Sequence, residues 1–192
     1  MLITTAPWHH VLALRPDLLS GELEMAEFAA DLYDVAEGRA ASVYRDPDRF
    51  FALTYPTHNL RDLVRNVALR LAGRGAKAVH QINVTFGGGK THALIALYHL
   101  AHDPARLPQV DAVNEFRQHA GVEFTPARVV LLPFDKIDVA RGLETRSPSG
   151  AMHRWLQPWT ILAYQLAGDD GVRSLHRDGN SSRTKRRLRN RS

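Results

Sequence analysis

The residues Gly87, Gly88, Gly89, Lys90, Thr91 and His92 combine the side-chain types that bind nucleotide phosphates. Glycine lacks a Cβ, so three in succession let the backbone turn closely around an anion. A helix that follows would direct its N–H groups and the positive end of its dipole into the same space. Lys90 would reach the β- and γ-phosphates, the Thr91 hydroxyl would ligate Mg²⁺, and His92 directly follows this pair. These six residues predict a nucleotide site, and we expect ATP with Mg²⁺ as the ligand.

The flanking sequence has most of the context that such a loop needs. Residues 78–84 resemble a strand, and the residues from 91 onward are strongly helical. The full P-loop pattern also has a glycine five positions before Gly89, where this chain has Val84. A second interpretation is therefore open, namely a glycine-rich turn with Lys90 solvated at a helix start. A lysine beside the positive end of a helix dipole is unfavourable without an anion, which favours the phosphate site.

The composition is that of a soluble globular domain, with 44% hydrophobic and 23% charged residues in a chain of 192. No apolar run approaches the length of a membrane span, and the first residues lack the pattern of a signal peptide. The absence of cysteine excludes disulfides and thiolate metal sites. We therefore expect a cytoplasmic protein that does not contact a membrane.

The net charge of +5 is unevenly distributed. Residues 172–192 hold eight basic residues and one acidic residue, whereas residues 1–171 hold 17 basic and 19 acidic residues. The body of the chain therefore gives no charge-based reason to expect nucleic-acid binding. The basic tail leaves that function open as an alternative.

Hydrophobic spacing and helix-end signals predict the secondary structure. We expect helices at 21–38, from Pro47 with Asp46 as its cap, from Asn59 to about 73, at 91–103, at 108–120 and at 158–167. We expect strands at 78–84 and 129–134, and a polar loop at 138–150. This order predicts an α/β chain: a helical N-terminal segment over 1–75, the incomplete start of a P-loop NTPase parallel sheet over 76–170, and a basic, disordered tail over 171–192.

Three further groups of residues have a possible chemical interpretation. His92, His99 and His102 share roughly one helix face and could form a metal site, but ordinary polar positions are favoured. Trp155 and Trp159 suggest a buried packing contact rather than a surface for base stacking. Asp135 follows the apolar run 129–134 and could hold Mg²⁺ in a phosphotransferase, or it could occupy a strand end or a turn. The sequence identifies no catalytic base, so the catalytic residues of a hydrolysis reaction stay unknown.

Five segments of the chain together resemble a known bacterial family. They are 26–32, 44–51, 85–92, 96–100 and 159–168. They resemble large P-loop proteins classified as domain of unknown function number 499, which look like AAA-type ATPases. Many of these proteins are encoded beside DNA-methyltransferase or restriction-like genes, so the resemblance implies genome defence and DNA-modification or restriction-type partner proteins. It covers roughly residues 7–170, and it implies a strand-end or turn position for Asp135 rather than a magnesium site.

The chain differs from the family in its length and in its C-terminal tail, and both differences affect the predicted function. Family members are much longer, which implies that this chain is a truncated N-terminal part of such an ATPase. The resemblance also stops near Asp170, which suggests that the arginine-rich tail arises from a shifted reading frame. The alternatives are a basic arm that makes weak nucleic-acid contacts through phosphates, and a non-functional gene fragment.

Overall fold

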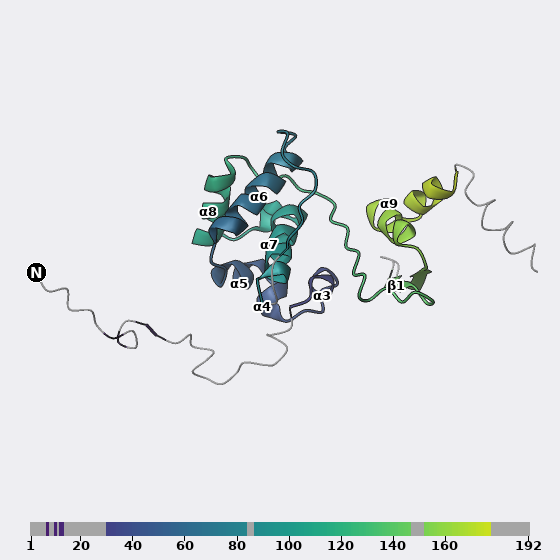
Figure 1. Cartoon of the computed structure of the whole chain (residues 1–192), viewed down its shortest axis with the longest axis horizontal. Helices are drawn as coiled ribbons and strands as arrows, with labels where there is room; N and C mark the ends of the chain where they lie inside the picture. The colour runs from purple at the N-terminus through teal and green to yellow at the C-terminus, as the bar shows by residue number, and fades with distance from the viewer. Residues whose placement is uncertain are drawn as a thin grey trace, which may run out of the picture.

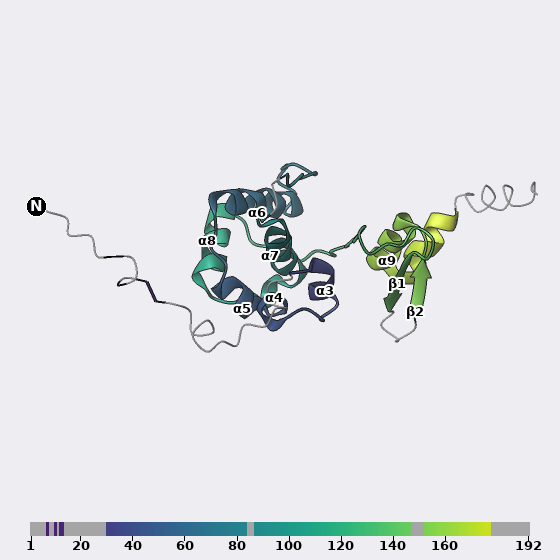
Figure 2. The same cartoon turned by 60° about the horizontal axis from the view of Figure 1, so that its bottom comes forward.

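The computed structural model of the protein describes residues 7, 10, 12–13, 30–83, 87–146 and 152–177. Helices α3 to α8 form one group (Figure 1), and β1, β2 and α9 form a second group (Figure 2). An extended segment joins the two groups, as both views show (Figure 2). The described chain is mostly helical and has one small antiparallel sheet of two strands.

The helical group is built around aromatic side chains. Its elements are α3 (Leu32–Ala36), α4 (Ser42–Arg45), α5 (Pro47–Ala52), α6 (His58–Leu71), α7 (Lys90–His102), the 3-10 turn η2 (Pro104–Arg106) and α8 (Asp111–Ala120). Phe51 of α5 lies edge-on to Phe50, with ring centroids 5.2 Å apart, and to Phe116 of α8, at 6.3 Å. Val64 of α6 and Ile95 of α7 complete this buried core. In α6 and α8 the buried residues recur at three- and four-residue steps, which places them on the inner face of the helix.

Several helix ends agree with the sequence. The Asp46 carboxylate accepts a hydrogen bond from the Asp48 N–H at 3.0 Å, as expected for a cap followed by Pro47. Gly73 and Gly121 end α6 and α8 with φ of +72° and +66°, a conformation that glycine adopts without strain. α7 ends at His102, one residue before the predicted end at 103, and Pro104 follows directly after its C-cap.

Other helix starts differ from the prediction. Thr57 caps α6, because its hydroxyl accepts from the Leu60 N–H at 3.4 Å, whereas Asn59 lies inside the helix. α8 begins at Asp111 rather than at 108. The helix expected over 21–38 is not continuous in its described part, because Asp31 is extended and caps the short helix α3. Residues 21–29 lie outside the described residues.

Neither predicted strand forms in the residues that the structure describes. Residues 78–83 are irregular and leave Val79 82% exposed, and residues 129–133 are extended but pair with no other strand. The Gln165 side chain instead bonds both the N–H and the carbonyl oxygen of Leu131, each at 2.8 Å. A strand needs a hydrogen-bonded neighbour, and here a side chain takes that place. The described part of the chain therefore shows no parallel sheet.

The predicted polar loop at 138–150 contains a strand instead. β1 (Leu143–Arg146) pairs antiparallel with β2 (Met152–Trp155), with Leu143 opposite Trp155. Trp155 packs on Tyr164 of α9, with ring centroids 4.8 Å apart, as its predicted packing role requires. Trp159 is 69% exposed, so its predicted burial is wrong.

α9 (Pro158–Arg177) breaks where the sequence predicts a helix end. Ala167 and Gly168 have non-helical backbone angles, and Gly168 has φ of +61°. The chain then resumes as a helix to Arg177, so residues 171–177 belong to α9. The rest of the predicted basic tail, 178–192, lies outside the described residues. Among the helices that the structure describes, none combines the length and apolar character needed to cross a membrane.

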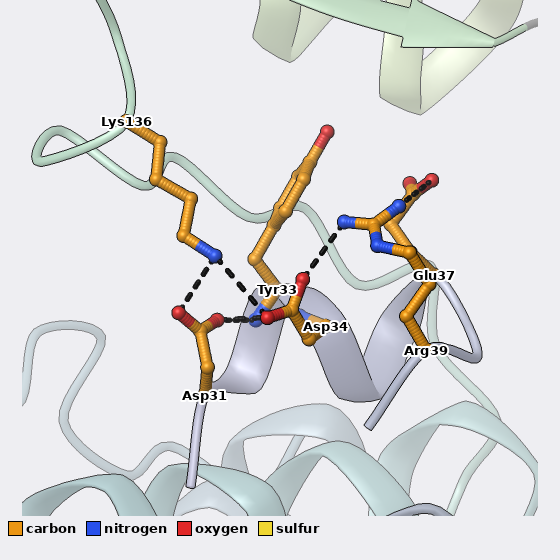
Figure 3. Close-up of polar contacts among 6 residues, drawn as sticks. All are labelled: Asp31, Tyr33, Asp34, Glu37, Arg39 and Lys136. Carbon is orange, nitrogen blue, oxygen red and sulfur yellow. Dashed lines mark hydrogen bonds and ion pairs between the residues drawn. The ribbon is translucent and has the colours of Figure 1, made fainter. Parts of the chain in front are cut away.

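Lys136 ties the extended segment to α3 (Figure 3). Its Nζ lies 2.7 Å from Asp31 Oδ2 and 3.5 Å from Asp34 Oδ2. The Tyr33 ring lies between Lys136 and Arg39, which are 5.4 Å and 5.7 Å from its centroid. Burial disfavours ionised Asp31. The hydrogen bond and charge of Lys136, together with the hydrogen bonds from the N–H groups of Asp34 and Tyr33, outweigh this effect, so the pKa of Asp31 lies below its usual value. The hydrogen bond that Lys136 donates to Asp31 in turn raises the pKa of Lys136.

Candidate phosphate-binding site

The glycine loop ends at a left-handed glycine, and α7 begins at the next residue. Gly89 is the N-cap of α7 and has φ of +75° and ψ of +18°, and Gly87 has φ of +78°. A Cβ added at either position would meet no atom within 4 Å. The left-handed backbone, rather than a lack of space, is therefore what requires glycine at these two positions. Gly88 does not have a positive φ.

The start of α7 is open to an incoming ligand. Gly87, Gly88, Gly89 and Lys90 are exposed, and Thr91 is partly buried. Gly89 has no side chain with which to cap the helix, and the first turn holds no acidic residue. The first N–H groups of any helix have no partner inside that helix. The arrangement places backbone donors, a lysine and a threonine hydroxyl at one accessible helix start.

His92 lies differently from the other five predicted site residues. Its Nε2 is 3.1 Å from the Thr54 Oγ1, and its ring packs on Phe50, with centroids 4.6 Å apart. Burial lowers the pKa of His92. The imidazole therefore joins α7 to α5 and its following turn, while a direct contact with phosphate stays a prediction.

Comparison with known families matches residues 9–138 to the family described as the DUF499 N-terminal domain. This match covers more than half of the chain and includes the glycine loop and helices α3 to α8. The chain belongs to this family. No curated protein and no solved structure matches the chain.

His99 and His102, the other two histidines of α7 in this DUF499 domain, do not form a shared site with His92. His99 Nε2 donates to the Tyr44 carbonyl oxygen at 2.8 Å, since a carbonyl can only accept. His102 instead stacks on Tyr98, with ring centroids 5.0 Å apart. Burial lowers the pKa of His99, against the opposing effect of its bond to Tyr44. Within the described ranges, no group of three or more His, Cys, Asp or Glu residues could hold a metal.

Asp135 occupies a turn and not a strand end in the DUF499 domain. It is exposed within the turn 134–136, beside the Lys136 that binds α3. This confirms the expected turn position. The alternative in which Asp135 holds Mg²⁺ for phosphotransfer stays an untested hypothesis.

Sequence reasoning did not find the residues that hold His92. Thr54 and Phe50 lie 38 and 42 positions earlier in the chain, in a different helix and its following turn. No local spacing signal links positions so far apart, because the contact exists only once α5 packs on α7. The unusual placement of a histidine directly after Lys90 and Thr91 was the one available hint.

Proposed function

We propose that this DUF499 N-terminal domain binds ATP with Mg²⁺ at Gly87, Gly88, Gly89 and the first turn of α7. The observation that carries the proposal is the left-handed Gly89 immediately before Lys90 at an exposed helix start. The N-terminus of α7 is suited to binding phosphate, because backbone N–H groups and the helix dipole both favour an anion. The residue order Gly-Lys-Thr adds the two side chains that nucleotide phosphates and their metal require.

Each residue of the site has a separate role in this proposal. The glycine backbone supplies N–H donors, and Lys90 supplies a positive charge to the β- and γ-phosphates. Thr91 is the second residue of α7, and its hydroxyl ligates Mg²⁺. His92 supports the loop indirectly, through the contact of its Nε2 with Thr54. Hydrolysis would need an acidic magnesium ligand and a group that orients water, and we assign neither.

The proposal extends to the larger context that the sequence resemblance implies. The domain would be the nucleotide-binding part of an AAA-type ATPase, with a parallel sheet completed around the loop. DNA-modification or restriction-type proteins would be its partners. Nucleic-acid contact through residues 178–192 concerns residues outside the described structure, so we propose no second function.

Titration with a fluorescent ATP analogue tests the proposal in the full chain. With Mg²⁺ present we expect a Kd in the micromolar range, equivalent to about 8 kcal/mol of binding free energy. EDTA in place of Mg²⁺ should weaken binding by about tenfold or more, because Thr91 then has no metal to ligate. AMP should compete poorly, since it lacks the β- and γ-phosphates. If no binding is seen up to millimolar nucleotide, the proposal is wrong.

A further inference from the structure

We infer that Thr54 is a positioning residue for the phosphate loop. It holds the His92 ring through a directed hydrogen bond and so fixes the first turn of α7, which carries Lys90 and Thr91. This inference rests on the proposed nucleotide site. It assigns a role to a residue that lies outside the loop and outside α7.

The direction of the hydrogen bonds follows from the chemistry of the three groups. Thr54 Oγ1 lies 2.7 Å from the carbonyl oxygen of Phe50, which can only accept, so the single hydroxyl hydrogen points there. The Thr54 oxygen can then only accept from its second partner. His92 Nε2, at 3.1 Å, must therefore carry a hydrogen and donate it.

The surroundings make this pair rigid. Thr54 is 6% exposed and Phe50 is 1% exposed, so both belong to the packed interior. The Phe50 ring covers the His92 ring at a tilt of 30°. The imidazole is thus fixed by a hydrogen bond at its edge and by an aromatic ring against its face. Neither contact leaves it free to rotate without loss of packing or of the bond.

The consequence for the loop comes from the short distance along α7. His92 is the third residue of the helix, directly after Thr91 and two residues after Lys90. The Ala93 N–H bonds the Gly89 carbonyl oxygen at 2.9 Å, so this first turn is closed. Fixing His92 therefore fixes the backbone that presents the lysine, the threonine and the glycine N–H groups. A preorganised site loses less free energy on binding than one that must be ordered by its ligand.

Thr54→Val tests the inference, because it keeps the shape of the side chain and removes the hydroxyl. We expect the Kd for the fluorescent ATP analogue to rise about five- to tenfold, the effect of one lost hydrogen bond. The matched control is Thr145→Val in β1. It removes the hydroxyl of a similarly buried threonine, which accepts from Trp155 Nε1 at 2.9 Å. That variant should bind as the wild type does. Thr54→Ser, which keeps the hydroxyl, should restore most of the affinity.

Nitrogen NMR of the imidazoles gives a second readout, which does not depend on nucleotide. The wild type should show a His92 Nε2–H protected from exchange with solvent, and Thr54→Val should lose that protection. An unprotected His92 Nε2–H in the wild type would overturn the inference, even if Thr54→Val failed to fold. Unchanged affinity in Thr54→Val, beside a loss in Lys90→Ala, would overturn it and leave the proposed function intact. Unchanged affinity in both variants would instead reject the nucleotide site itself.

Discussion

Lys90→Ala should abolish most of the nucleotide affinity of this domain. Lys90 is exposed at the first position of α7, and in the proposed complex its ammonium group bonds the β- and γ-phosphates. A hydrogen bond that involves charged groups contributes about 1.5–3 kcal/mol, so the Kd should rise by roughly 10- to 150-fold. Titration of the variant with the fluorescent ATP analogue and Mg²⁺ measures this change.

Two further variants test whether the change in Kd is specific to Lys90. Lys77→Ala removes the same charge from another exposed lysine and should leave the Kd within about twofold of the wild-type value. Lys90→Arg keeps the positive charge and should retain part of the affinity. Equal weakening by Lys77→Ala and Lys90→Ala would point to general charge attraction and against a phosphate loop.

Phe51→Ala should cause a large loss of stability. Phe51 is 1% exposed, and its ring contacts Phe50, Phe116 and His99. Truncating a buried phenylalanine removes its transfer free energy and leaves a cavity, which together cost about 3–5 kcal/mol. Urea unfolding followed by far-UV circular dichroism should show a correspondingly lower free energy of unfolding.

Phe134→Ala is the control for this prediction, because Phe134 is 69% exposed. Its effect on the free energy of unfolding should stay within about 0.5 kcal/mol. A loss below about 1 kcal/mol for Phe51→Ala would contradict the aromatic core that joins α5 to α7 and α8.

Capping residues and glycines predicted the helix ends that depend only on neighbouring residues in the sequence. Asp46 and Pro47 were sufficient to place the start of α5, and Gly121 to place the end of α8. The start of α7 after Gly89 follows in the same way, because the sequence contains both the permissive glycines and the helical run. The accessible part of the candidate site could therefore be predicted without the structure.

The rest depends on partners that lie far away in the sequence. Residues 129–133 have the composition of a buried strand, but Gln165 bonds Leu131 where the prediction required a neighbouring strand. The hairpin of β1 and β2 was missed because Glu144, Arg146 and Arg154 make its sequence polar. Thr54 was missed for a related reason, since its contact with His92 forms only through the packing of α5 on α7. Periodicity and caps carry no information on such contacts.

Hydrogen–deuterium exchange with and without ATP and Mg²⁺ tests the central claim most directly, because it locates the bound phosphates on the backbone. If the glycine loop and the start of α7 hold the nucleotide, exchange at the amides of residues 87–93 should slow when nucleotide is added. The exposed residue Val79 and its neighbours serve as an internal reference and should exchange at an unchanged rate. Nucleotide binding without slower exchange over residues 87–93, or with protection confined to another part of the chain, would contradict the account.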